Sequence, residues 1–253
     1  MNLYWLIQGH TKYYREICST FGSKENIYWV TEKDSPNLGY ILGNSNIKII
    51  PVERVEHGFG RILIHSKSTT QGLKYLKSLG ADTVIKLRSD LIVDNLTGYE
   101  ELVQQCISKY PDKLFGHCYV KHGGLFIDNP ILTTRTREWL FSLGSKIIES
   151  DQNYITDWIH SGNIDELILF YEGVRLDNYN DPIICEIRFI ASYFLNKGYD
   201  LNFTYEYLTD KIKLMLGLLY NSNINLFSLK EGMNYSKMHI TGEHKSLPDN
   251  FLP

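Results

Sequence analysis

The stretch that fixes the fold class is Asp82-Thr-Val-Ile-Lys-Leu-Arg88-Ser89-Asp90-Leu-Ile-Val93, an apolar segment interrupted by three consecutive polar residues. Such a continuous apolar run predicts a strand buried on both faces, as in a parallel sheet covered by helices. Burying three polar residues inside it is costly unless they have partners. Two interpretations stay open: an Arg88–Asp90 ion pair at a bend, or a binding site built from Arg88, Ser89 and Asp90.

The sequence before this stretch alternates between short apolar runs and helical patterns. Residues 3–7, 27–30 and 47–52 predict further strands, and residues 14–21 and 68–79 predict helices. Alternating helices and continuously apolar strands are typical of a mostly parallel sheet with both faces covered. We therefore expect an α/β fold, a Rossmann-like three-layer α/β/α sandwich.

The second half of the chain is more mixed. Residues 113–120 and 124–127 predict strands joined by a turn, and residues 187–195 and 206–220 predict helices. Asn163 is suited to cap the N-terminus of another helix. No repeat or linker divides the chain, so we expect a single domain over residues 1–253.

Composition excludes several classes of protein. A net charge of -3 argues against binding of bulk polyanions, so no nucleic-acid partner is expected. The four cysteines lack CxxC spacing, which disfavours a zinc site or a disulfide framework. We find no signal peptide and no apolar run of transmembrane length, and we expect a cytoplasmic protein. Phosphate-loop, GxSxG and HExxH motifs are also absent from the sequence.

Ligands of open parallel sheets bind at the carboxyl ends of the strands. That rule selects Gln8 and Gly9 after the first strand, Thr31 after the second, and Arg88-Ser89-Asp90 after the fourth.

The polar triplet resembles, in its context, the Asp-X-Asp motif of nucleotide-sugar transferases with the GT-A fold. The resemblance implies a GT-A-like fold, a nucleoside-diphosphate sugar as donor, and Mn²⁺ or Mg²⁺ bound by Asp90. Arg88 replaces the first Asp of that motif. Either Asp90 still binds the ion, or Arg88 contacts phosphate itself and reduces the need for metal.

The C-terminal segment Met238-His239-Ile-Thr-Gly242-Glu-His-Lys245 resembles the His-X-X-Gly-X-X-Lys segment of glycogenin and lipopolysaccharide galactosyltransferases. The resemblance implies that His239 binds the metal, Gly242 lets the backbone approach phosphate, and Lys245 binds the diphosphate. Ser246-Leu247-Pro248 stands where that group often has Pro and Trp.

A third resemblance extends over residues 6–190, in the order of several short segments. They are similar to segments of the WavE family of lipopolysaccharide-synthesis proteins, which are regarded as glycosyltransferases. The segments are Leu6-Ile7-Gln8-Gly9, Gly60-Arg61-Ile62 with Ser66 and Gly72-Leu73, Ile85 to Leu91, Thr156-Asp157-Trp158-Ile159-His160-Ser161-Gly162, and Cys185-Glu186. Cys185 and Gly60 replace a Pro and an Asn that are common in the family.

The WavE resemblance implies donor contacts by Gln8, Arg61, Arg88 and Asp90, and an acceptor side that contains Asp157 and Glu186. Within the single domain we expect residues 1–95 to form the nucleotide-sugar-binding half, and residues 96–253 to form the acceptor-side half with the C-terminal segment that closes over the diphosphate.

The expected activity is transfer of a hexose-type sugar to a hydroxyl of a surface glycan or lipopolysaccharide-like acceptor. Peripheral membrane association would come through that acceptor, and the oligomeric state is left open. Asp157 and Glu186 are rivals for the general base, which a retaining enzyme would not need. Asp157 could instead hydrogen-bond a hydroxyl of the donor sugar. Two alternatives remain: a sugar-nucleotide hydrolase or sugar-phosphate transferase on the same scaffold, or a catalytically silent nucleotide- or glycan-binding module.

Overall fold

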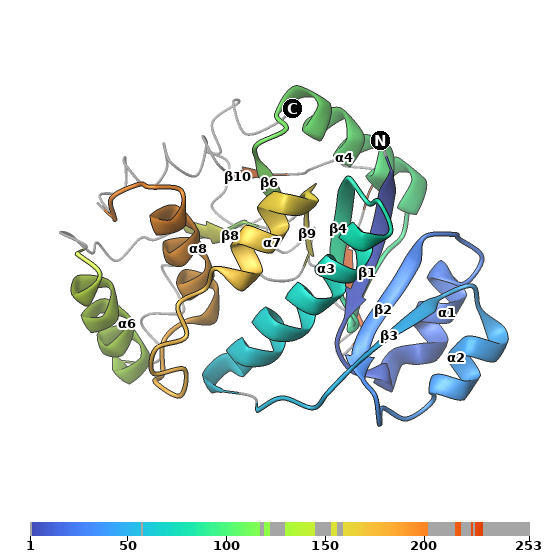
Figure 1. The fold of residues 1–253 in the computed structure, drawn as a ribbon, viewed down its shortest axis with the longest axis horizontal. Helices are drawn as coiled ribbons and strands as arrows, with labels where there is room; N and C mark the ends of the chain where they lie inside the picture. The colour runs from blue at the N-terminus through green and yellow to red at the C-terminus, as the bar shows by residue number, and fades with distance from the viewer. Residues whose placement is uncertain are drawn as a thin grey trace.

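A seven-stranded sheet forms the centre of the molecule (Figure 1). The computed structural model describes residues 2–56, 58–116, 119–121, 130–144, 153–155, 159–201, 216–218, 224 and 226–229. In spatial order the strands are β10 (Leu216–Leu218), β6 (Leu114–Gly116), β9 (Ile159–Asn163), β4 (Thr83–Arg88), β1 (Leu3–Gln8), β2 (Ile27–Glu32) and β3 (Lys48–Val52).

The sheet is mostly parallel. β1 is parallel to β2 and β4, β2 is parallel to β3, and β6 is parallel to β10. β9 is antiparallel to both β4 and β6, so it alone of these strands opposes the rest. The expected α/β fold with a mostly parallel sheet is confirmed, and strands from residues 1–95 and 96–253 pair within it.

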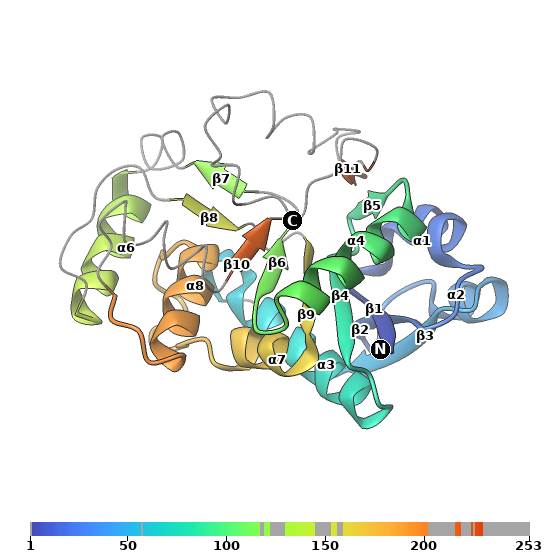
Figure 2. The same cartoon turned by 90° about the horizontal axis from the view of Figure 1, so that it is seen from above.

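Helices cover both faces of the sheet and make the other two layers (Figure 2). The α3 face is covered by α3 (Thr69–Ser78) and α7 (Ile164–Glu172), and the α4 face by α1 (Tyr14–Phe21) and α4 (Leu96–Lys109). None of the described helices is long and apolar enough to span a bilayer.

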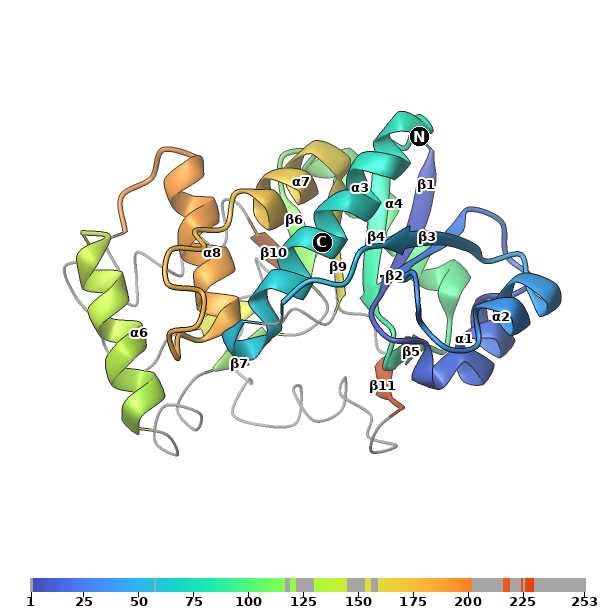
Figure 3. The same ribbon diagram turned by 60° about the horizontal axis from the view of Figure 1, so that its bottom comes forward.

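The remaining described helices extend the layers sideways. α2 (Leu38–Asn44) lies beside α1, and α8 (Cys185–Asn196) packs against α7. α6 (Pro130–Ser142) lies beyond α8 at the other end of the molecule from α2 (Figure 3). Two small two-stranded sheets pair β5 (Leu91–Val93) with β11 (Leu226–Ser228), and β7 (Tyr119–Lys121) with β8 (Asn153–Ile155).

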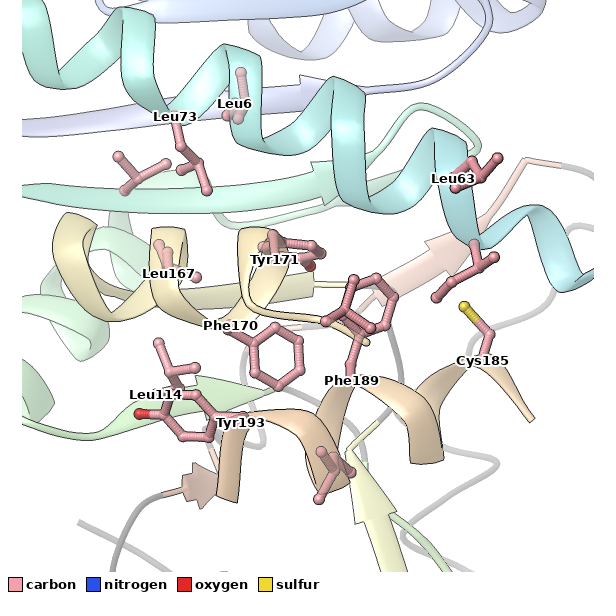
Figure 4. Close-up of a cluster of buried hydrophobic side chains, with 14 of the residues drawn as sticks. Leu6, Leu63, Leu73, Leu114, Leu167, Phe170, Tyr171, Cys185, Phe189 and Tyr193 are labelled. Carbon is pink, nitrogen blue, oxygen red and sulfur yellow. The ribbon is translucent and has the colours of Figure 1, made fainter. Parts of the chain in front are cut away.

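Aromatic packing fixes α8 against α7 (Figure 4). The rings of Phe170 and Phe189 stack with centroids 5.4 Å apart, and Tyr193 meets Phe170 edge-on at 5.5 Å. The Tyr193 hydroxyl donates to Glu166 at 2.6 Å. Offset and edge-on aromatic pairs add to the apolar burial, so this contact defines how the two helices sit.

The direction of α8 follows from these contacts. Asn163, just before α7, pairs with Thr83 at the amino ends of the parallel strands, so α7 runs from that edge towards the carboxyl edge. Tyr193 near the end of α8 contacts Glu166 near the start of α7, so the two helices are antiparallel. The N-terminus of α8 therefore lies on the carboxyl-end side of the sheet.

Several expectations from the sequence can be compared with these elements. The helices expected at residues 14–21 and 68–79 correspond to α1 and α3, and Asn163 caps α7 by accepting from the Asp165 amide at 2.9 Å. The helix expected over residues 206–220 is wrong at its end. There, Leu216–Leu218 form β10 because the apolar run pairs with β6. Residues 124–127 lie outside the described part of the chain.

Candidate functional site

The carboxyl ends of β1 and β4 bring the expected donor residues together. Gln8 and Arg88 are direct register partners, so their side chains leave the same face of the sheet. The Ser89 amide donates to the Gln8 carbonyl at 2.9 Å, which continues the pairing one residue beyond the strands. Gln8 and Ser89 are buried, as is Asp90 at 8% exposure. The structure thus juxtaposes the predicted residues Gln8, Arg88 and Ser89.

Gly9 allows this close approach. Its φ of 129° is a conformation that favours glycine, and a Cβ placed on it would lie 2.5 Å from the Ser89 Oγ. The indole N–H of Trp29 donates to the Gly9 carbonyl at 3.0 Å and fixes the peptide. Gly9 is therefore required for the geometry at the strand ends.

Arg88 and Asp90 form a bidentate ion pair across the bend. Arg88 Nε donates to Asp90 Oδ1 at 3.0 Å, and the second guanidinium nitrogen donates to Oδ2 at 2.6 Å. The first of the two interpretations left open by the sequence is therefore present in the structure. It does not exclude the second interpretation, because ligands of open parallel sheets bind at the carboxyl ends of strands, where this pair lies.

A row of polar side chains continues from Gln8 and Arg88 into the α3 face. Lys86 is fully buried two residues before Arg88, and His160 of β9 is its register partner. The Lys86 Nζ lies 5.4 Å from the centre of the Tyr171 ring, and the Tyr171 hydroxyl is 2.6 Å from His160 Nδ1. A buried ammonium is expensive without compensation, so this row is an unusual feature for the interior of a sheet.

The sequence contains a signal for this row that is separate from the motifs described above. Within residues 82–93, Lys86 and Arg88 alternate with the apolar Ile85 and Leu87. Residues two apart in a strand lie on the same face. The alternation places both cations on one face.

The side-chain oxygen of Gln8 is an unpaired acceptor among the described residues. This oxygen, Oε1, is buried. Most buried polar atoms in native proteins are paired, so an unpaired one at a strand end is a candidate ligand contact. An oxygen acceptor there would bind an N–H or O–H donor.

Thr31 occupies a different face. Gln8 pairs with Val30, so the next residue, Thr31, directs its side chain to the α4 face. The Thr31 hydroxyl is 2.8 Å from that of Ser35, within the loop that follows β2. Gln8 and Thr31 therefore border the same edge of the sheet from opposite faces.

Two other predicted residues lie on the carboxyl-end side. Arg61 is exposed in a 3-10 turn, Phe59–Arg61, that precedes α3, and α3 runs from this side to the start of β4. Glu186 is half-buried in the first turn of α8. The carboxylate of Glu186 at a helix N-terminus is also stabilised by the helix dipole.

The remaining predicted residues, Asp157, His239, Gly242 and Lys245, lie outside the described part of the chain. Residues 226–229 nevertheless lie at the site. β11 pairs with β5, and the Leu229 amide donates to the Asp90 carbonyl at 2.8 Å. The chain therefore passes directly beside Asp90 a short distance before His239.

A divalent cation was expected on Asp90. Both carboxylate oxygens of Asp90 accept from Arg88, so a cation bound there would share the carboxylate with the guanidinium. The described residues also contain no group of three or more His, Cys, Asp or Glu able to hold a metal. The assignment of Asp90 and His239 as metal ligands remains a prediction, because His239 lies outside the described residues.

Comparison with known proteins adds a distant likeness. No family model and no curated protein matches the sequence. Among solved structures, the chain is similar to mannose-1-phosphate geranyltransferase from Thermus thermophilus. The identity is 9% and the TM-score 0.40, over 76% of this chain and 68% of that chain. A likeness this remote supports no assignment of function, and the resemblance to WavE proteins rests on the quoted segments alone.

Proposed function

We propose that this protein is a glycosyltransferase that moves a sugar from a nucleoside-diphosphate sugar to a hydroxyl of a surface glycan or lipopolysaccharide-like acceptor. The observation that carries the proposal is the pairing of Gln8 and Arg88 at the carboxyl ends of β1 and β4. A buried acceptor without a partner among the described residues lies there beside a cation, at the edge where ligands of parallel sheets bind. Any membrane association would be peripheral, through a glycolipid acceptor.

In this proposal the donor diphosphate lies against Arg88. When the bond between the sugar and the diphosphate breaks, the leaving nucleoside diphosphate gains negative charge. A fixed guanidinium stabilises that charge without reorganisation. Arg61 provides a second cation on the same side, and Gln8 and Thr31 border the nucleoside. Ser89 and Gly9 shape the backbone beneath it.

The C-terminal segment would close over the diphosphate, with Lys245 as a point charge and Gly242 allowing close approach. The expected Mn²⁺ or Mg²⁺ on Asp90 and His239 would share the Asp90 carboxylate with Arg88. Arg88, which pairs with Asp90 in the described residues, would stabilise the charge of the leaving group in this proposal.

Acceptor activation would come from Glu186 or Asp157. In an inverting reaction, the acceptor oxygen attacks the anomeric carbon, its proton passes to the carboxylate, and the nucleoside diphosphate departs. Glu186→Gln should then lower turnover by on the order of 10²–10⁴-fold with little change in donor affinity. Normal turnover of this variant would remove Glu186 from the mechanism and leave Asp157 to be tested in the same way.

The experiment that tests the proposal is thermal stabilisation by a panel of nucleoside diphosphates and sugar nucleotides, each with and without Mn²⁺. A ligand at about 100 times its dissociation constant should add roughly 2.7 kcal/mol to the free energy of unfolding. Stabilisation by one nucleotide family supports the proposal and identifies the base. Stabilisation that needs Mn²⁺ would restore the metal site on Asp90 and His239.

The alternatives predict different products from the same ligands. Release of free sugar without an acceptor would indicate a sugar-nucleotide hydrolase, and transfer of a sugar phosphate would indicate a sugar-phosphate transferase. Binding with no turnover across a broad acceptor panel would indicate a silent binding module. No stabilisation by any nucleotide would contradict the proposal.

A further inference from the structure

The turn that carries Arg61 has a strained backbone. Arg61 has φ of 60° and Gly58 has φ of 64°, both in the left-handed region. For a residue with a side chain this conformation is unfavourable, so the surroundings must hold the turn in place. The Arg61 side chain is exposed and has no hydrogen-bond or ion-pair partner among the described residues.

Tyr179, in the loop between α7 and α8, holds this turn. The Phe59 amide donates to the Tyr179 carbonyl at 2.9 Å. The Tyr179 hydroxyl donates to Glu56 at 2.7 Å, on the other side of the turn. A Cβ on Gly58 would lie 3.2 Å from the Tyr179 carbonyl oxygen, so the two backbones are in direct contact. The position of Tyr179 therefore sets the position of the Arg61 turn.

Arg188 in turn holds the loop that contains Tyr179. Its guanidinium is 1% exposed and donates to three successive parts of the loop backbone: the carbonyls of Arg175 at 3.2 Å, Asp177 at 3.1 Å and Asn178 at 2.8 Å. The same guanidinium lies 5.3 Å from the centre of the Trp139 ring on α6. A planar fork with several donors suits this arrangement, and a lysine ammonium does not reproduce it.

We propose that Arg188 is a positioning residue that acts through Tyr179 to hold the exposed Arg61 guanidinium towards the donor diphosphate. The inference rests on the proposed function for its ligand, but the contacts from Arg188 to the Arg61 turn are independent of that ligand. The link runs from α8 through the 175–179 loop, which precedes it in the chain, to the turn before α3, which is far from both in the sequence.

The first test measures the link itself. Amide hydrogen exchange at Phe59 should be about tenfold faster in Arg188→Lys than in the wild type, because the Tyr179 carbonyl is no longer held. Arg175→Lys is the matched control, since the exposed Arg175 contributes only its backbone carbonyl to the contact. Unchanged Phe59 exchange in a folded Arg188→Lys variant would overturn the inference.

The second test measures positioning of Arg61, with UDP and GDP as probes in a double-mutant cycle. Arg61→Ala and Arg188→Lys should each weaken binding about tenfold. The double variant should bind no more weakly than Arg61→Ala alone, because both changes remove one interaction. Additive losses would overturn the inference, as would a loss of thermal stability in Arg188→Lys with unchanged affinity.

The same measurements distinguish failure of the proposed function from failure of this inference. If the wild type binds no nucleotide, the transferase proposal fails, and Phe59 exchange alone decides whether Arg188 holds the turn. If Arg188→Lys does not fold, Tyr179→Ala loosens the same turn by removing the ring beside Gly58 and the bond to Glu56, and the same two measurements apply.

Discussion

The two faces of the central sheet are built from the same strands but differ in chemistry near the carboxyl edge. On the α4 face, β1 and β4 present Trp5, Ile7, Ile85 and Leu87, all buried and apolar. On the α3 face, the same strands begin with Leu6 and Val84 and then change to Gln8, Lys86 and Arg88. Both faces contain apolar core, but on these two strands only the α3 face ends in polar side chains near the carboxyl edge.

Because the two faces differ, substitutions on them should separate effects on stability from effects on nucleotide binding. Neighbouring residues on one strand lie on opposite faces, so single substitutions one position apart should affect different properties. Variants on the α4 face should lower stability without changing nucleotide affinity, and variants at the end of the α3 face should do the reverse.

The largest effect is expected for Ile85→Ala on the α4 face. Ile85 is fully buried, and truncation of such a side chain removes apolar contacts and leaves a cavity. The free energy of unfolding should fall by about 2–5 kcal/mol, measured by urea denaturation. Nucleotide affinity, measured well below the melting temperature, should match the wild type. A large loss of affinity would break the separation between the two faces.

A buried thiol should make the stability of the α4 side depend on pH. Burial raises the pKa of Cys106, in α4, from 9.0 to about 11. Because the pKa of Cys106 is higher in the folded state, its protonated thiol contributes to the free energy of unfolding. This contribution is fully present below pH 9 and is lost as the pH rises towards 11. Its size is on the order of 2–3 kcal/mol. Unfolding of wild type and Cys106→Ala at about pH 8 and about pH 11 measures it, and equal pH dependence of both would contradict it.

Gln8→Met should change stability the least of these variants. It should nevertheless weaken nucleotide binding. Gln8 Oε1 is buried without a partner among the described residues, so replacing the amide with an apolar group of similar size should leave stability unchanged or raise it by about 1 kcal/mol. Nucleotide affinity should fall about tenfold. Ile7→Val, on the opposite face, is the control and should cost about 0.5–1.5 kcal/mol with unchanged affinity. A substantial destabilisation by Gln8→Met would show that the amide is structural.

The mostly parallel sheet of the first half of the chain could be predicted from the sequence, because continuous apolar strands and amphipathic helices alternate there, whereas the spatial order of the strands came from the structure. The helix α4 is not among the predicted helices, although the sequence contains its signal. Asn95 caps it, and its buried residues follow steps of three and four: Leu96, Tyr99, Leu102, Val103, Cys106 and Ile107. The strand β10 lies where a helix end was expected, because a three-residue apolar run has no period of its own and depends on pairing with β6.

In the candidate site, the rule that ligands bind at the carboxyl ends of parallel strands selected Gln8, Gly9 and Arg88, and the structure places them side by side. The separation of Gln8 and Thr31 onto opposite faces needed the register of β1 and β2, which no local pattern contains. The contacts of Arg188 with the 175–178 loop could not be predicted from the sequence either, because they join a helix side chain to backbone carbonyls, which form no recognisable motif.

The most direct single test is titration calorimetry of the nucleotide that best stabilises the protein, with wild type, Arg88→Ala and Arg135→Ala. Arg135 is an exposed arginine on α6 that pairs with Glu138, so it controls for loss of one positive charge. If Arg88 holds the diphosphate, Arg88→Ala should lose roughly 10- to 100-fold in affinity, as expected for charged hydrogen bonds, while Arg135→Ala binds normally. Equal affinity in all three proteins would show that the nucleotide is not bound at the end of the α3 face.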